Sequence, residues 1–332
     1  MSVDPRWNGD DTETLAAAVI GVGSMGRHHA RVYSELQNVS LIGVYDVQEE
    51  QARSIAAKYG TTVSSQSKLL EKADIVSVAV PTAYHYAVVR DALEADTHVL
   101  VEKPFVDDLA RGRELAALAY ARDLTLQVGH IERFNPATQV LMEIIPDLDV
   151  IGVDIKRLGP PVDRDGNDSV VMDLMIHDVD ILLAIVDAEI ETIAATAHDP
   201  SHATAQVQFA NRCVGSLTAS RLTQQKVREL SVTAKSCQVN IDFIDQSVEI
   251  HRCSLPEYVE ANGDIRYRHE SVVERPMVDN SEPLKAELAS FVDAVREGRD
   301  PVVTAAQAIR TLEVIEEIES KAFDRPVEVE KA

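Results

Sequence analysis

The sequence predicts an α/β protein: a doubly wound parallel sheet in the N-terminal part, then an α+β domain with a large, mostly antiparallel sheet. Three observations support this. Short apolar runs alternate with helical patterns from residue 15 to about 129, as in parallel sheets covered by helices on both faces. Several β-like segments adjoin one another between 190 and 252. At 332 residues the chain also exceeds what one core usually serves, so two domains are expected.

The N-terminal domain is expected over 15–132, after a flexible acidic tail at 1–14. Its strands are predicted at 15–20, 39–45, 74–80, 97–101 and 124–128. Its helices are predicted at 24–37, 48–59, 84–95 and 108–121, with Asp107 or Asp108 capping the last. Ligands of such a sheet bind beyond the carboxyl ends of its strands.

The C-terminal domain is expected over 133–332 and is predicted to bind substrate and to form oligomers. It should contain a helix at 136–145, a strand at 149–158, a loop at 159–168, a helix at 169–186, β-segments from 190 to 252 and closing helices within 283–322. The closely adjoining β-segments indicate an antiparallel or mixed sheet.

A glycine-rich turn follows the first predicted strand, where Gly21, Gly23 and Gly26 have the spacing G-x-G-x-x-G. The first glycine permits a tight turn, the second lets the backbone approach a pyrophosphate, and the third lets helix pack closely on strand. The helix N-terminus would offer N–H groups to phosphates. We therefore predict a dinucleotide site here, including Ser24 and Met25; the alternative is a structural turn that binds nothing.

Asp46 ends the second predicted strand, at about the twenty-residue distance from the glycines that dinucleotide-binding units show. A carboxylate there accepts hydrogen bonds from the adenosine ribose and repels a 2′-phosphate. The sequence therefore favours NAD over NADP.

Lys103 lies in the segment Glu102-Lys103-Pro104, directly after the fourth predicted strand. Because proline fixes its own φ and restricts the residue before it, we expect Lys103 to be held at the ligand-binding edge. It could donate to a substrate hydroxyl and take part in proton transfer, with Glu102 beside the cofactor. The alternative is a solvated lysine at a strand end.

Asp173 and His177 are four residues apart in the helix predicted at 169–186 and would share a face with Asp180. A carboxylate and an imidazole at this spacing suit a histidine general base oriented by an aspartate. The alternatives are a structural hydrogen bond and a metal pair, although no further ligand cluster in the sequence supports a metal.

Residues that follow the other strands are further candidates. Pro81, Thr82 and His85 follow the third predicted strand and are expected to contact the cofactor. His130 and Arg133 follow the fifth strand, where the N-terminal domain ends, and are expected to contact the substrate.

The chain has 55 acidic and 32 basic residues, a formal charge of −23 that is spread along its length. Such a field disfavours nucleic acid and anionic membranes as partners. It fits an ordinary acidic cytosolic protein or adaptation to a salt-rich cytoplasm, where ions screen self-repulsion. Acids outnumber bases even in the predicted surface helices, which favours the second account.

Other sequence features are consistent with a cytoplasmic protein. The apolar runs are shorter than the ~20 residues that span a bilayer, and residues 1–14 lack the apolar segment of a signal peptide. The three cysteines are widely spaced, which indicates neither a disulfide framework nor a metal motif.

Taken together, the motifs resemble the glucose–fructose oxidoreductase / inositol dehydrogenase / rhizopine-catabolism family of NAD(P)-dependent oxidoreductases. The similar segments are AVIGVGSMGRHHA (18–30), EKPF (102–105), GHIERFNP (129–136), DLMIHDVD (173–180) and the stretch 284–318. The resemblance implies an N-terminal Rossmann domain, a C-terminal sheet that usually forms the oligomer interface, a catalytic Lys103, and Asp173 and His177 as site residues. Many members carry glycines just before that aspartate, where this chain has Val170-Val171, which puts the helix entry and pocket shape in question.

Within the family, GHIERFNP and MDLMIHDVDI (172–181) are similar to the branch of UDP-N-acetylglucosamine 3-dehydrogenases and related nucleotide-sugar enzymes. A diphosphate substrate needs local positive charge in so acidic a protein. Arg133, Arg157 and Arg164 are the candidates for supplying it.

The resemblance therefore implies an NAD-dependent dehydrogenase that oxidises a secondary hydroxyl of a sugar or nucleotide sugar, in a homodimer or homotetramer. His177 would take the hydroxyl proton, oriented by Asp173, while Lys103 hydrogen-bonds the same oxygen; Lys103 and His177 could also share or exchange the acid–base role. The alternatives are an inositol or free-sugar dehydrogenase, a reductase of the opposite direction, and a dinucleotide-binding regulator without catalysis.

Overall fold

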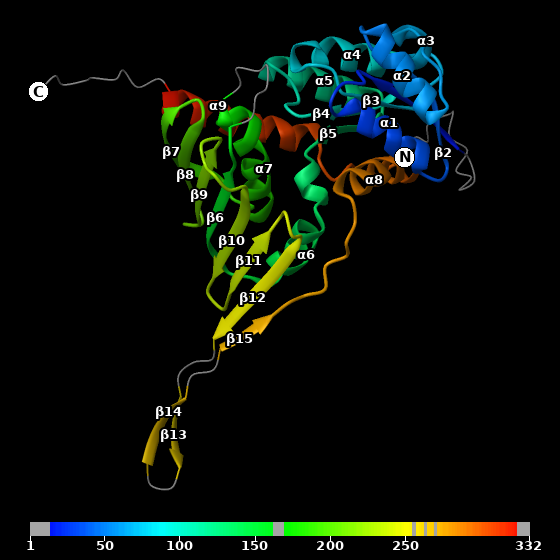
Figure 1. Cartoon of the computed structure of the whole chain (residues 1–332). Coiled ribbons are helices and arrows are strands. Elements are labelled where there is room, and N and C mark those ends of the chain that lie inside the picture. The colour runs from blue at the N-terminus through cyan, green and yellow to red at the C-terminus, as the bar shows by residue number, and fades with distance from the viewer. Residues whose placement is uncertain (1–13, 162–168, 254–256, 262–263, 269–270, 324–332) are drawn as a thin grey trace, which may run out of the picture. The chain divides into compact units, whose positions relative to one another are not determined.

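The computed structural model describes residues 14–161, 169–253, 257–261, 264–268 and 271–323 (Figure 1). The chain forms two compact units. Unit 1 comprises Met1–Phe134 and Ser281–Glu313, and unit 2 comprises Asn135–Asn280 and Val314–Ala332. The division between the units falls within the last helix, α9 (Ala305–Phe323).

Unit 1 contains a five-stranded sheet in the order β2-β1-β3-β4-β5, and every pairing in it is parallel. The strands are β1 (Leu15–Ile20), β2 (Val39–Tyr45), β3 (Ile75–Val78), β4 (His98–Glu102) and β5 (Leu126–Gly129). They agree closely with the predicted strands, because strands buried on both faces are apolar throughout. The strand order reverses between β1 and β3, which is where doubly wound sheets bind their ligands.

Helices connect these strands. They are α1 (Gly26–Glu35), α2 (Glu49–Tyr59), α3 (Gln66–Leu70), α4 (His85–Glu94) and α5 (Leu109–Ala121), with 3₁₀ turns η1 (Thr82–Tyr84) and η2 (Ile131–Phe134). The short α3 was not predicted. Asp108 caps α5 as predicted, since its carboxylate accepts a hydrogen bond from the Arg111 N–H at 3.1 Å.

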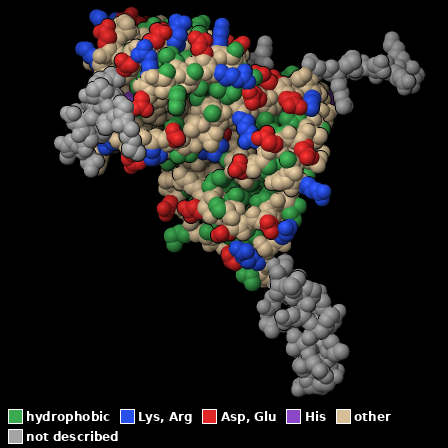
Figure 2. Space-filling view, turned by 180° about the vertical axis from the view of Figure 1, so that it is seen from behind, with side chains coloured by type: hydrophobic (Ala, Val, Ile, Leu, Met, Phe, Trp, Pro, Cys, Tyr) green, Lys and Arg blue, Asp and Glu red, His purple; other side chains and the backbone are tan. Residues whose placement is uncertain are grey.

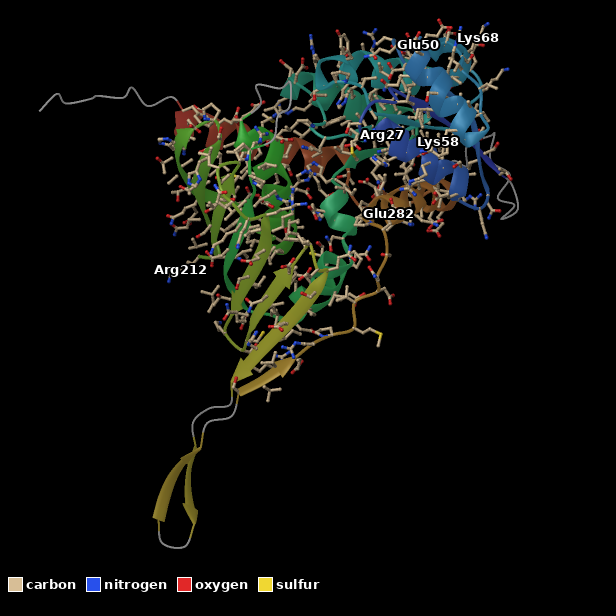
Figure 3. The ribbon with its side chains drawn as sticks, viewed as in Figure 1. Arg27, Glu50, Lys58, Lys68, Arg212 and Glu282 are labelled. Atoms are coloured by element: carbon tan, nitrogen blue, oxygen red, sulfur yellow. The ribbon has the colours of Figure 1, made fainter. Side chains whose placement is uncertain are left out.

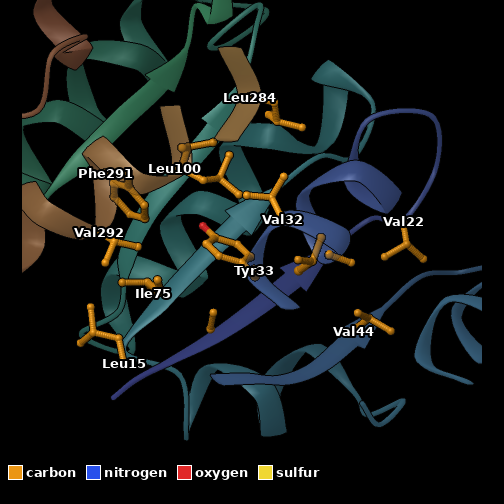
Figure 4. Close-up of a cluster of buried hydrophobic side chains, with 14 of the residues drawn as sticks. Leu15, Val22, Val32, Tyr33, Val44, Ile75, Leu100, Leu284, Phe291 and Val292 are labelled. Carbon is orange, nitrogen blue, oxygen red and sulfur yellow. The ribbon is translucent and has the colours of Figure 1, made fainter. Parts of the chain in front are cut away.

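Helix α8 (Pro283–Glu297) belongs to unit 1, although the sequence-based division put this segment in the C-terminal domain. Its apolar face joins a buried cluster with residues of the sheet and of α1 (Figure 4). Leu284, Leu288 and Phe291 of α8 lie there with Leu15 and Tyr33, among others. An amphipathic pattern shows that a helix buries one face, but not against which partner, which is why the boundary differs.

Unit 2 contains an eight-stranded sheet in the order β15-β12-β11-β10-β6-β9-β8-β7. Its strands are β6 (Val150–Leu158), β7 (Ile190–Asp199), β8 (His202–Phe209), β9 (Val214–Ser220), β10 (Val227–Ala234), β11 (Gln238–Asp242), β12 (Ser247–Cys253) and β15 (Ser271–Glu274). All pairings are antiparallel except β6 with β9. This confirms the predicted mostly antiparallel sheet; β15 and a separate hairpin, β13 (Glu257–Ala261) and β14 (Asp264–Arg268), were not predicted.

Unit 2 contains the helices α6 (Pro136–Ile144) and α7 (Ile176–Ile185), the 3₁₀ turn η3 (Ile145–Asp147), the π turn η4 (Val171–Met175) and the part of α9 from Val314 onward. Helix α7 packs closely on β9 at Gly215, where a Cβ would lie 2.5 Å from a methyl carbon of Leu182. Buried and less buried residues alternate along β10, as expected for a sheet covered on one side, and Leu230 and Val232 are fully buried.

Acidic and basic side chains are interspersed over the face drawn in Figure 2. None of the helices in the described residues combines the length and apolar character needed to cross a bilayer.

Candidate active site

The glycine turn between β1 and α1 has the geometry that a dinucleotide requires. Gly21 has φ +85°, and a Cβ there would lie 2.7 Å from the Ala79 carbonyl oxygen; at Gly26 a Cβ would lie 1.8 Å from the Gly21 oxygen. At Gly23 a Cβ would meet only the Gln51 amide, at 3.9 Å. The first and third glycines are therefore demanded by the fold, whereas the second leaves open space beside the backbone.

Two side chains hold this turn in place. The Val22 N–H donates to Asp46 Oδ2 at 2.8 Å, and Gln51 Nε2 donates to the Val22 carbonyl at 2.7 Å. Asp46 is half-buried, and each carboxylate oxygen has a second lone pair for a ribose hydroxyl. Asp46 thus connects the end of β2 to the glycine turn, a structural role that sequence spacing did not reveal. Gln51, which also bonds to the turn, was not predicted.

The residues present fit the phosphates of NAD. Helix α1 has no acidic residue in its first turn, so its positive end is not neutralised. Its second residue, Arg27, is exposed and basic (Figure 3). Ser24 is exposed and Met25 half-buried beside the open face at Gly23.

The loop after β3 is fixed to the loop after β4 by His85. This histidine is 1% exposed. Its Nε2 lies 2.8 Å from the Val80 carbonyl oxygen and its Nδ1 lies 2.9 Å from that of Pro104. Burial lowers the pKa of the imidazole and outweighs the hydrogen bonds to backbone carbonyls, which raise it, so the net pKa is lowered. These contacts support the loops themselves; cofactor contact by His85, by half-buried Thr82 and by exposed Pro81 stays a prediction.

Glu102 and Lys103 lie at the carboxyl end of β4, as predicted, and Lys103 is half-buried. The peptide bond from Lys103 to Pro104 is cis. The Glu102 carboxylate does not project into solvent: its side chain is 12% exposed and Oε1 lies 2.9 Å from His29 Nε2. Burial raises the pKa of Glu102, but the His29 hydrogen bond and nearby positive charge outweigh it, so the net pKa is lowered.

His130 and Arg133 follow β5 within unit 1. His130 is 1% exposed, and its backbone N–H donates to the Val128 carbonyl at 2.8 Å. Arg133 is half-buried in η2. Their contact with a substrate stays a prediction.

In unit 2, Asp173 lies in η4 and His177 in the first turn of α7. The helix predicted over 169–186 is confirmed, since 170–185 form one uninterrupted helical segment. Its residues 171–175 have π geometry, which the sequence did not reveal and which often occurs at functional sites. The Ser169 hydroxyl oxygen caps the turn by accepting a hydrogen bond from the Met172 N–H at 3.1 Å. Val170 and Val171 are fully buried.

Arg221, directly after β9, holds the Asp173 carboxylate. Its Nη2 donates to Asp173 Oδ2 at 2.6 Å, and both side chains are 22% exposed. Sequence reasoning missed this residue, which lies 48 positions from its partner. His177 is half-buried, and its orientation by Asp173 stays a prediction. Among the described residues, no group of three or more His, Cys, Asp or Glu could hold a metal ion.

Arg157 is buried, whereas a substrate contact was expected to be accessible. It is 2% exposed on β6, and its Nε donates to Asp178 Oδ1 at 2.7 Å. Its guanidinium also lies over the Phe243 ring, 5.8 Å from the centroid. This geometry favours a buried structural ion pair that anchors α7 to β6. Arg164 lies outside the described residues.

Comparisons with known proteins agree with this geometry. Residues 15–130 match the family model described as "Oxidoreductase family, NAD-binding Rossmann fold", and residues 157–240 match the GFO/IDH/MocA C-terminal domain. The chain is 34% identical over 246 residues to a UDP-N-acetylglucosamine 3-dehydrogenase of Acidithiobacillus ferrooxidans, covering 71% of this chain and 77% of the relative. It is 24% identical over 311 residues to an inositol 2-dehydrogenase of Rhizobium meliloti, covering 86% and 90%.

A solved structure is similar over nearly the whole chain. It is that of the Acidithiobacillus ferrooxidans UDP-N-acetylglucosamine 3-dehydrogenase, with a TM-score of 0.85, 28% identity, and coverage of 93% of this chain and 97% of the other. The matched family model and the relative at 34% identity lead to one conclusion: this chain belongs to the GFO/IDH/MocA family of oxidoreductases and has an NAD-binding Rossmann domain.

Proposed function

We propose that this oxidoreductase is a sugar or nucleotide-sugar dehydrogenase, and that its substrate is UDP-N-acetylglucosamine, oxidised at C3. The observation that carries the proposal is the similarity to a UDP-N-acetylglucosamine 3-dehydrogenase in both sequence and structure. The glycine turn, Asp46 and Lys103 follow the carboxyl ends of β1, β2 and β4, where the cofactor is proposed to bind. The Asp173–His177 segment supplies an acid–base pair of the kind that alcohol oxidation needs.

When bound, NAD⁺ supplies the hydride acceptor for the carbinol carbon. The proposed roles of the protein are to bind the substrate and to move one proton. His177 takes the proton of the hydroxyl, and Lys103 donates a hydrogen bond to the same oxygen. Asp173, whose carboxylate accepts a hydrogen bond from Arg221 at 2.6 Å, has the proposed role of orienting His177. Either Lys103 or His177 could be the final proton acceptor in this scheme.

Arg133 and His130 are the proposed substrate contacts of unit 1. Arg133 is half-buried and can offer a planar guanidinium to a diphosphate. The burial of Arg157 and its pairing with Asp178 do not support the same role for Arg157. We further propose a homodimer or homotetramer as the working assembly.

The test is NADH formation, followed by absorbance in high-salt buffer, with UDP-N-acetylglucosamine, free N-acetylglucosamine, glucose and myo-inositol as substrates. Activity with the UDP-sugar alone supports the proposal. Activity only with free sugars or inositol would contradict the nucleotide-sugar assignment and favour the inositol dehydrogenase relatives. Silence with the whole panel, while NADH still binds, would favour a regulator without catalysis.

A further inference from the structure

His29 has a buried position that the reaction scheme above does not use. It lies on α1, three residues after the last glycine of the turn, and its side chain is fully buried, whereas the adjacent His28 is exposed. Its Nε2 lies 2.9 Å from Glu102 Oε1, and its Nδ1 lies 3.0 Å from Ser77 Oγ. One imidazole therefore joins the cofactor-turn helix to the ends of β3 and β4.

The ionisation of Glu102 determines the direction of its hydrogen bond with His29. Glu102 is ionised at neutral pH, because the His29 hydrogen bond and nearby positive charge outweigh the effect of burial. An ionised carboxylate only accepts, so His29 Nε2 donates the hydrogen bond to Glu102. On its other side, Ser77 Oγ lies 2.9 Å from the Tyr33 hydroxyl, whose pKa is raised by burial, so that it stays protonated.

The set Ser77, His29 and Glu102 has the composition of a hydrolase triad, but burial excludes that function. Ser77 and Tyr33 are fully buried, so no substrate carbonyl can reach the serine hydroxyl. The network can act only on the residues attached to it.

Lys103 is such a residue. Its backbone N–H donates a hydrogen bond to the Glu102 carboxylate. The same carboxylate is closely enclosed on another side, since a Cβ at Gly129 would lie 3.3 Å from Glu102 Oε2. The Glu102 carboxylate thus contacts His29 beside Gly129 and accepts a hydrogen bond from the Lys103 backbone.

We propose that His29 is a positioning residue for Lys103: by holding the Glu102 carboxylate it fixes the Lys103 backbone and couples it to the helix that begins at the NAD-binding turn. The expected change in kcat rests on the proposed dehydrogenase function, whereas the expected effect on the Lys103 backbone does not.

Two substitutions separate the two bonds of His29. In His29→Gln the side-chain amide nitrogen can replace Nε2 and still donate to Glu102; in His29→Asn the amide is shorter and can reach only the Ser77 side. We expect His29→Asn to lower kcat about tenfold or more, since small misplacements of reacting groups cost on this order. KM for NAD⁺ should stay within about twofold. His29→Gln should recover most of the rate, and His28→Asn on the exposed side of α1 is the matched control.

A merely structural histidine would give another pattern: both variants would lower the melting temperature and neither would separate kcat from KM. Equal kcat in His29→Asn and His29→Gln would overturn the proposal. If His29→Asn does not fold, Glu102→Gln makes the same test, since a neutral amide weakens the bond from His29 and kcat should fall; an unchanged kcat in a folded Glu102→Gln would overturn the proposal.

A second measurement is independent of activity. In protein labelled with ¹⁵N-lysine, the amide signal of Lys103 should shift in His29→Asn and remain near its original position in His29→Gln and His28→Asn. A shift without any dehydrogenase activity in the substrate panel would leave the positioning role intact and contradict the proposed function. An unmoved signal in a folded His29→Asn would contradict the positioning role itself.

Discussion

Lys103 and His177 carry the proposed proton chemistry, so removing either should affect turnover more than cofactor binding. We expect Lys103→Ala and His177→Ala each to lower kcat by about 10²-fold or more, with NADH affinity by fluorescence titration close to that of the original protein. Lys68→Ala and His198→Ala are matched controls, because both side chains are exposed. Near-normal turnover in both active-site variants would refute the assigned roles.

His85 makes stability dependent on pH in a direction that its environment dictates. Burial lowers its pKa from 6.5, whereas in the unfolded chain it keeps about its ordinary value. Between the two pKa values the unfolded state binds more protons. The stabilisation from neutral His85 is therefore complete above about pH 6.5 and declines as pH falls through the folded pKa.

We therefore expect the melting temperature of the original protein to fall more steeply just below pH 6.5 than that of His85→Gln, which cannot titrate. Differential scanning fluorimetry over a pH series measures this. Two parallel curves would show that His85 titrates alike in the folded and unfolded states.

At the scale of elements, the strand–turn–helix unit β1–α1 contains two glycines whose roles can be separated. In Gly26→Ala the Cβ would lie 1.8 Å from a backbone oxygen, whereas in Gly23→Ala it would meet only the Gln51 amide at 3.9 Å. We expect Gly26→Ala to destabilise unit 1 strongly, and Gly23→Ala to keep the melting temperature but weaken NADH binding. Thermal melts and fluorescence titration measure the two effects.

Gly159→Ala is the control, since a Cβ there meets no atom within 4 Å. Loss of stability in Gly23→Ala equal to that in Gly26→Ala would contradict the separation. So would unchanged NADH binding in a folded Gly23→Ala.

Elements that obey a local rule were predictable, and those decided by distant partners were not. The apolar run Leu15–Ile20 and the cap at Asp108 were read correctly from neighbouring residues. The helix at 169–186 was also predicted correctly, but not the π geometry of its residues 171–175, because a local pattern that fits an α-helix fits a wider turn equally well.

Sequence spacing correctly placed the glycine turn after β1, Asp46 after β2 and Lys103 after β4, whereas their roles in a site stay predictions. It could not find residues whose partners are remote. His29 and Glu102 are 73 positions apart and Arg221 and Asp173 are 48 apart, and neither pair leaves a periodic signal. A motif predicts candidate residues for a site, but their supporting contacts follow from the fold.

At the scale of the whole molecule, the net charge of −23 leads to a prediction about salt. Like charges repel in the compact state, and ions screen that repulsion, over about 10 Å at 0.1 M salt and about 3 Å at 1 M. We expect the melting temperature and activity to rise between low salt and molar KCl. A fully stable and active protein at low ionic strength, with no gain from salt, would contradict adaptation to a salt-rich cytoplasm.

The place of α8 in unit 1 has a consequence for biosynthesis. The hydrophobic core of unit 1 includes Leu284 and Phe291, which leave the ribosome only after nearly all of unit 2 has been made. At typical elongation rates this interval is on the order of ten seconds, during which Leu15, Ile75 and their neighbours lack the side chains that finally cover them. The first unit to be translated is thus among the last to be completed, and until then the nascent chain exposes apolar side chains that later belong to a core.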